Sequence, residues 1–449
     1  MASFDLLLRN GSVVTEAGVG TADVAVADGT IVAVEPELAA TAREEVDATG
    51  LHVFPGVIDA HVHFNEPGRT EWEGWATGTC ALAAGGGTCA FEMPLNAHPP
   101  TLDAASFDAK RAAAEAQAVT DFALWGGLVP GNRDRLPELA ERGVIGLKAF
   151  MSQSGTDDFL AADDLTLYEG MATAAELGLI VAVHAESDAL TGRLAARAIA
   201  EGRTGVRDYL ASRPVLAEVE AIGRAILFAE ATGCRLHVVH VSSGAGIAQI
   251  AAAKARGVDV SCETCPHYLL FTEDDVERLG AVAKCAPPLR AEFERDALWR
   301  GLAAGDILIV ASDHSPSPPA MKQGSDFFAI WGGISGCQST LPALLSEGHH
   351  RRGVRLATIA AVTAGAVAHR FHLPRKGRIA VGADADLALV ALADSFVQEA
   401  DALLYRHRQS PFVGHRFTGR VVRTVLRGTT VCLDGRVRTT AGGRLVRPR

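Results

Sequence analysis

Eight short apolar segments, separated by longer helical stretches, constrain the fold of this chain more than any other feature. Most of their residues are apolar, as expected for strands that are buried on both faces of a parallel sheet. The segments cover residues 52–64, 88–94, 121–128, 144–150, 179–186, 235–243, 258–265 and 306–314. Ala-rich stretches such as AASFDAKRAAAEAQA and VLAEVEAIGRAILFAEATG lie between them and have helical periodicity. The alternation predicts an α/β fold, a (β/α)8 barrel of the TIM type, over residues 54–379.

The two chain ends differ from this middle region. Residues 1–53 and 380–449 contain short strand-like runs divided by turns, and neither piece has enough strands to bury a face alone. We therefore expect them to form the two parts of one small β-sandwich domain. Residues 1–53 carry 9 acidic and 2 basic residues, whereas 380–449 carry 6 acidic and 11 basic ones, so their charges are complementary. A basic nucleic-acid-binding tail is the alternative, but the basic residues alternate with Val and Leu, which favours the sandwich.

Composition and charge exclude several classes of protein. The chain of 449 residues is 48% hydrophobic and 21% charged, which excludes disorder, and its net charge of −11 argues against nucleic acid as a partner. It has no apolar run of about 18 residues and no basic region before an apolar run at its N-terminus, so we expect no membrane segment and a cytoplasmic location. The eight Cys residues are scattered, which favours reduced thiols. Cys262 and Cys265 have C-x-x-C spacing, but they lie in an apolar run and are expected to be buried strand residues.

Several histidines, a lysine and an aspartate lie in or directly after the predicted strands. They are His61 and His63 of the first segment, Lys148 of the fourth, His184 of the fifth, His240 of the sixth and Asp313 of the eighth. Each alone has an ordinary structural explanation, such as a polar strand end, a paired lysine or a helix cap. Active sites of TIM barrels lie at the carboxyl ends of the strands, so these side chains should converge. Neutral imidazoles and a carboxylate are typical zinc ligands, and the set predicts a metal centre.

Longer motifs reveal a resemblance to a known family. The segments are GVIDAHVH (56–63), GLKAF (146–150), VHAE (183–186), HVVHVSS (237–243) and ASDH (311–314). Through them the chain resembles the cyclic amidohydrolases of the amidohydrolase superfamily, the group that includes dihydroorotases and hydantoinases. Within that group it is most similar to the allantoinases, in the segments HFNEPGRTEWEG (63–74), MPLN (93–96), CPHY (265–268), KCAPP (284–288) and WGGISGCQ (331–338).

The resemblance implies two divalent metal ions, with zinc expected, bridged by a carbamylated Lys148. His61, His63 and Asp313 would hold one ion, and His184 and His240 the other. Carbamylation turns a buried cation into a bridging anion, which removes the high cost of an unpaired charge. Asp313 would also be catalytic, because a carboxylate beside the attacking water can accept its proton and pass it to the leaving nitrogen.

The expected substrate is a small cyclic ureide, allantoin, which would be opened to allantoate. Asn65 stands where dihydroorotases carry an Arg that grips the substrate carboxylate, and Gln153 stands where hydantoinases and dihydropyrimidinases carry a Tyr. A hydantoinase or dihydropyrimidinase activity is the alternative, and a non-catalytic scaffold is a third possibility, against which the complete ligand set argues. The candidate substrate contacts are Asn65, Asn96, Cys285, Ser317 and Trp331. By analogy with the family, we expect a homo-oligomer, a tetramer.

Overall fold

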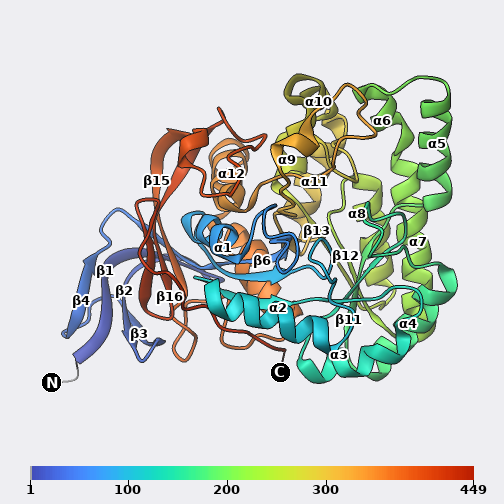
Figure 1. Ribbon diagram of the computed structural model, residues 1–449. Coiled ribbons are helices and arrows are strands. Elements are labelled where there is room, and N and C mark those ends of the chain that lie inside the picture. Colours follow the sequence, from blue (N-terminus) through green and yellow to red (C-terminus); the bar gives the residue numbers. More distant parts are fainter. Residues whose placement is uncertain (1–2, 449) are drawn as a thin grey trace.

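The two chain ends form one sheet beside the barrel (Figure 1). The computed structural model describes residues 3–448. The N-terminal strands are β1 (Ser3–Thr15), β2 (Gly18–Ala27), β3 (Thr30–Glu35), β4 (Thr41–Asp47) and β5 (His52–Pro55). The C-terminal strands are β15 (Leu387–Val397), β16 (Arg416–Leu426), β17 (Thr429–Leu433) and β18 (Arg436–Val437). The strand order is β18-β17-β16-β15-β5-β1-β2-β3, and β4 pairs with β1.

The junction of the two ends is β5, which runs parallel to β1 and antiparallel to β15. Val53 of β5 lies opposite Leu389 of β15, and both are buried in one apolar cluster with Leu8 of β1. An ion pair of 2.8 Å between Arg423 and Glu44 also joins the ends. The prediction that both ends build one β domain beside the barrel is therefore confirmed.

Turn chemistry explains the hairpins of this sheet. The dipeptides Asp28-Gly29 and Asp434-Gly435 connect neighbouring antiparallel strands, and all four residues have positive φ. Two-residue hairpin loops require such backbone angles to match the strand twist, and Asp-Gly adopts them at little cost.

The barrel strands lie between these ends, and each predicted segment corresponds to one barrel strand, except the third, which corresponds to two. They are β6 (Val57–Val62), β7 (Gly87–Glu92), β8 (Asp121–Leu124), β9 (Gly126–Gly127), β10 (Leu147–Phe150), β11 (Ile180–His184), β12 (Arg235–Val238), β13 (Val260–Thr264) and β14 (Ile309–Val310). Neighbours pair in parallel, and a bridge between Val62 and His314 links the first segment to the last. The third segment is divided at Trp125, whose indole N–H donates to the Ala60 carbonyl at 3.2 Å. Every strand residue except Arg235 is buried, as a sheet covered on both faces requires.

Helices cover the outside of the barrel (Figure 1). They are α1 (Trp75–Ala84), α2 (Ala104–Gln117), α3 (Leu136–Arg142), α4 (Asp164–Glu176), α5 (Asp188–Ala200), α6 (Val206–Ser212), α7 (Val215–Thr232), α8 (Gly244–Ala255), α9 (Pro266–Leu270), α10 (Glu273–Leu279), α11 (Glu292–Ala304), α12 (Thr340–Ala343), α13 (Leu356–Ala360) and α14 (Ala366–Arg370). Short 3-10 turns are η1 (Arg133–Arg135), η2 (Gly280–Ala283), η3 (Pro319–Lys322), η4 (Cys337–Ser339) and η7 (Ala400–Ala402), and η5 (Leu344–Arg351) and η6 (Ala361–Gly365) are π-helical. None of the helices within residues 3–448 has the length and apolar character needed to cross a membrane.

Helix α7 shows how the sequence specifies this outer layer. Ala221, Ile222, Ala225 and Ile226 are buried at helical spacing and face the barrel, and the helix ends at Gly233 in the left-handed conformation. The prediction of a (β/α)8 barrel is thus confirmed.

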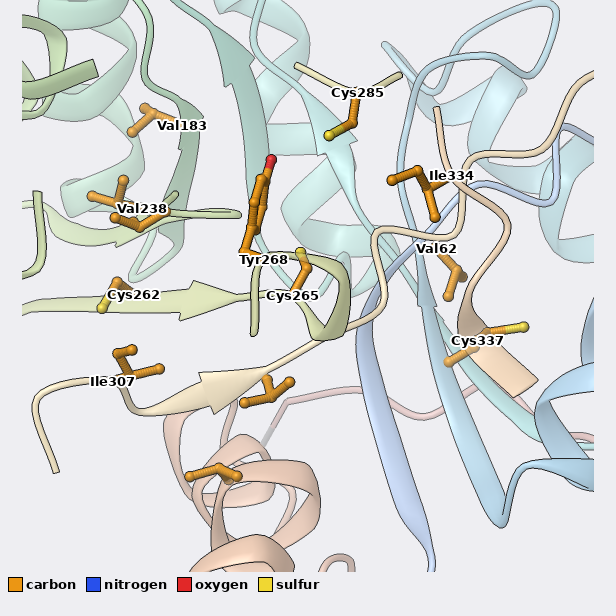
Figure 2. Packing of buried hydrophobic residues seen from close by; sticks show 14 of the residues in the cluster. Val62, Val183, Val238, Cys262, Cys265, Tyr268, Cys285, Ile307, Ile334 and Cys337 are labelled. Carbon is orange, nitrogen blue, oxygen red and sulfur yellow. The ribbon is translucent and has the colours of Figure 1, made fainter. Parts of the chain in front are cut away.

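The cysteines belong to the apolar core. Cys262 lies in β13 and Cys265 directly precedes α9, and both are free and fully buried. Figure 2 shows them with Cys285 among the buried side chains of the barrel. Burial raises the pKa of Cys262 to about 12, so this thiol is uncharged and packs as a small apolar group.

Candidate metal centre

The predicted ligands converge at the carboxyl ends of the barrel strands. Nε2 of His61 lies 3.2 Å from Oδ1 of Asp313, and Nε2 of His63 lies 3.5 Å from the same oxygen. One ligand atom from each of these three buried residues lies within 4.8 Å of the others. Two imidazoles and a carboxylate at this spacing have the chemistry and geometry to hold a divalent metal ion.

Two residues of the centre have a backbone conformation that L-residues rarely adopt. His240 lies two residues after β12 and Asp313 three residues after β14, and their φ values are 39° and 45°. Positive φ turns their side chains out of the regular strand direction, and such local strain is typical of functional sites. Burial alone would raise the pKa of Asp313, but the neighbouring His61 and His63 outweigh it and hold the pKa well below its ordinary value.

A second pair of histidines lies on the neighbouring strands. Nδ1 of His184 and Nε2 of His240 are 3.1 Å apart, and their ring centroids are 4.7 Å apart. The other nitrogen of His184 lies 2.9 Å from Oε2 of Glu186, which fixes the orientation of the ring. Because a carboxylate only accepts, the proton of His184 lies on Nε2, and Nδ1 is left as a free ligand atom. The His61 and His240 rings are 5.5 Å apart, so the two pairs form one group.

Lys148 of β10 lies in the same group and is fully buried. Its Nζ has no hydrogen-bond partner among residues 3–448 and lies 5.0 Å from the Phe150 ring centroid. Burial lowers the pKa of Lys148 to about 7, although Glu263 and Asp313 act in the opposite direction. A lysine that is partly neutral near pH 7 and has an unpartnered nitrogen is suited to covalent modification.

Acidic residues behind the histidines were not predicted from the sequence. Glu263 of β13 lies with Oε1 2.5 Å from Nδ1 of His61 and Oε2 3.1 Å from Nε2 of His237. These contacts place the His61 proton on Nδ1 and leave Nε2 free towards Asp313. Burial raises the pKa of Glu263, but the two histidines outweigh it and hold the pKa at about 2. A carboxylate inside an apolar strand was the available signal, because a buried charge needs partners.

A cavity of about 350 Å³ opens above this centre. Among the predicted substrate contacts, Asn96, Cys285 and Trp331 line it, whereas Asn65 and Ser317 do not. Asn65 is fully buried in the loop after β6, with a φ of 66°, and donates from Nδ2 to the Pro316 carbonyl at 3.4 Å. Its place in the structure is therefore that of a loop residue.

Two lysines donate to backbone carbonyls beside the cavity, Lys284, which is buried, and Lys322, which is half-buried. Lys284 donates from Nζ to the carbonyls of Phe328, at 3.3 Å, and Ile330. Lys322 donates to the carbonyls of Trp331, at 3.0 Å, and Gly333, at 2.6 Å. The Gly333 N–H also donates to the Lys284 carbonyl at 2.8 Å. This bond connects the KCAPP segment to the WGG segment, and residues of both segments line the cavity.

A metal-binding cluster of histidines and an aspartate at the carboxyl ends of a (β/α)8 barrel defines a barrel hydrolase suited to divalent metal chemistry. Sequence comparison gives the same result. The chain belongs to the amidohydrolase family, whose model matches residues 52–431.

Individual relatives are similar over the full length. The chain is 62% identical to an allantoinase of Rubrobacter xylanophilus, over 100% of this chain and 98% of that protein. It is 58% identical to an allantoinase of Solibacter usitatus, over 99% of this chain and 97% of that protein. Among solved structures, an L-hydantoinase (dihydropyrimidinase) from Arthrobacter aurescens matches with a TM-score of 0.96 and 35% identity, over 98% of this chain and 99% of that one.

Proposed function

We propose that this protein hydrolyses the cyclic amide bond of allantoin to give allantoate. The observation that carries the proposal is the convergence of the histidines, Lys148 and Asp313 in a chain that is 62% identical to an allantoinase over its full length. The hydantoinase similarity is lower, at 35% identity, and is consistent with a shared fold and reaction class.

We propose two divalent ions, with zinc as the metal. His61, His63 and Asp313 would hold one, His184 and His240 the other, and Lys148, carbamylated by carbon dioxide, would contribute to both. The buried groups fit these ions, because the Lys148 Nζ has no hydrogen-bond partner in residues 3–448 and two imidazole nitrogens face each other at 3.1 Å. The pKa of about 7 supports carbamylation, since only the neutral amine reacts.

Bound divalent ions would activate water near neutral pH and polarise the scissile carbonyl. We assign proton transfer to Asp313, which lines the cavity with Oδ1 3.2 Å from Nε2 of His61 and which its low pKa keeps ionised. It takes a proton from the attacking water and delivers it to the ring nitrogen as the carbon–nitrogen bond breaks. Glu263 keeps His61 in the required tautomer, and Glu186 does the same for His184.

The cavity favours an uncharged substrate. Asn65 stands where dihydroorotases have an Arg, and the lining residue Arg213 is already paired with Glu186. The other lining cation, Lys284, donates to the carbonyls of Phe328 and Ile330. A substrate carboxylate would therefore lack the Arg that dihydroorotases supply, whereas a neutral ureide needs none. Gln153, which stands where hydantoinases have a Tyr, also lines the cavity.

A turnover screen tests the proposal. Purified protein should be assayed on allantoin, hydantoin, dihydrouracil and dihydroorotate. We expect kcat/KM for allantoin to exceed that for dihydroorotate by about a hundredfold or more, because an unpaired buried carboxylate costs a few kcal/mol. Equal values, or preference for dihydrouracil, would contradict the substrate assignment and favour the dihydropyrimidinase alternative.

We further propose that the chain acts as a homo-oligomer, a tetramer, in the cytoplasm. Eight free cysteines support a reducing compartment. Exposed leucines support association: Leu165 of α4 and Leu216 and Leu227 of α7 are all more than half exposed. Light scattering of the protein as it elutes from a size-exclusion column measures its molecular mass in solution. A monomer at all concentrations would contradict the proposal.

A further inference from the structure

Arg213, which directly follows α6, lines the cavity together with Lys284. Its backbone is fixed because the Arg290 guanidinium donates to the Arg213 carbonyl. Its guanidinium lies 5.6 Å from the ring centroid of Tyr209, whose hydroxyl donates to the Cys285 carbonyl at 2.9 Å. The side chain therefore has a defined position at the cavity, where it remains 20% exposed.

The guanidinium of Arg213 has donors that the protein does not use. A guanidinium carries five N–H groups, and Nη1 of Arg213 donates to Glu186. Among residues 3–448, no other acceptor lies within hydrogen-bond distance of this guanidinium. Within the described part of the chain, Asp313 is the only carboxylate that lines the cavity, and it belongs to the metal centre. The remaining donors of Arg213 are therefore available to a bound molecule.

Glu186 links Arg213 to the reacting region. The same oxygen, Oε2, contacts Arg213 and Nε2 of His184, which is 2.9 Å away. Only the Glu186 carboxylate thus separates Arg213 from His184 of the metal centre. A short substituent on a substrate ring bound at that centre can span this separation. Because Glu186 neutralises the charge of Arg213, the ligand that fits is a neutral acceptor, such as a carbonyl oxygen.

We infer that Arg213 determines substrate specificity by donating hydrogen bonds to the carbonyl oxygen of the ureido arm of allantoin. This inference rests on the proposed function, because it concerns the substituent that distinguishes allantoin from simpler hydantoins. Hydantoins with an apolar arm have no acceptor at this place, so they leave the donors of Arg213 unsatisfied.

The test compares allantoin with 5-methylhydantoin, which has the same ring and an apolar arm. For Arg213→Met, we expect kcat/KM for allantoin to fall about ten- to a hundredfold, as for a lost hydrogen bond to a charged group. The value for 5-methylhydantoin should stay within about threefold, because Arg213 makes no bond to a methyl group. Arg213→Lys should be intermediate, since it keeps a cation beside Glu186 but loses the planar fork.

Glu186→Gln is the matched control, because it keeps an acceptor for both neighbours but removes the charge beside His184. Metal content is measured for every variant. Equal losses on both substrates in Arg213→Met, as expected in Glu186→Gln, would mean that Arg213 only supports His184 and would overturn the inference. Unchanged allantoin kinetics would overturn it as well.

Two further comparisons keep the result unambiguous. If turnover of 5-methylhydantoin is too slow to measure, inhibition by the two products, allantoate and N-carbamoylalanine, gives the same comparison. Arg213→Met should then weaken inhibition by allantoate and leave inhibition by N-carbamoylalanine unchanged. Failure of the proposed function itself is distinguishable, because the unmodified protein would then not hydrolyse allantoin at all.

Discussion

Replacing Lys148 by methionine should stabilise the metal-free protein. The side chain is fully buried and its Nζ has no partner among the described residues, so the unmodified lysine must either lose its proton or hold an uncompensated charge. Methionine has a similar length and no charge. In the holoprotein the order should reverse, because the proposed carbamate contributes to metal binding.

The size of the effect follows from the pKa of Lys148, which burial lowers from 10.5 to about 7. This difference corresponds to about 5 kcal/mol of destabilisation below pH 7. Between about pH 7 and 10.5 the unfolded chain binds a proton that the folded chain lacks, so the stability of the unmodified protein rises with pH in this window. At pH 9 the free energy of unfolding of the Lys148→Met variant should exceed that of the unmodified protein by about 2 kcal/mol.

Urea unfolding of chelator-treated protein in carbon dioxide-free buffer, from pH 6.5 to 9.5, measures this gap. Lys254→Met is the matched control, because Lys254 is exposed on α8 and its replacement should give no comparable pH-dependent gap. A gap for Lys148→Met that does not change with pH, or a variant less stable than the unmodified protein, would refute the reasoning.

Three further predictions concern the centre itself. Asp313→Asn should lower kcat about 10²–10⁴-fold with little change in KM, at equal metal content. Turnover within about tenfold of the unmodified protein would mean that another residue transfers the proton, with His314 the next candidate. Lys148→Ala should lose most activity and regain part of it with short carboxylic acids, whereas Lys148→Arg with full turnover would exclude a carbamate. Elemental analysis should find two divalent ions per chain, and removal by chelators should abolish turnover until metal is restored; an active, metal-free preparation would contradict the centre.

The positions of the metal-site residues could be predicted because they depend on local order along the chain. A histidine or aspartate at the end of an apolar strand faces the active rim of any TIM barrel, whatever its neighbours are. His63 and Asp313 lie far apart in sequence, yet each position follows from its own segment. Sequence reasoning therefore brought both residues to one place.

The lining of the cavity could not be predicted in this way. Asn65 was expected to contact substrate because it stands where dihydroorotases carry an Arg that grips the substrate. Its positive φ and the surrounding loops leave it buried outside the lining. Arg213 gave no signal in the sequence, because an arginine between two helices is ordinarily a solvated residue. Its partner Glu186 is 27 residues away in the chain, and the packing of α6 against α5 and α10 accompanies their approach.

The sequence by itself determined the order of strands and helices, the pairing of the two ends and the identity of the chemical groups at the strand ends. The order of elements follows from hydrophobic periodicity and turn chemistry, which act over a few residues. The pairing of the ends follows from their complementary charges and from the need of each piece to cover an apolar face. The tertiary structure alone decided which carboxylate orients each histidine, as Glu263 does for His61, and which side chains face the cavity. Those pairings depend on the angular position of each strand around the barrel and on loop conformation, which result from the packing of the whole chain.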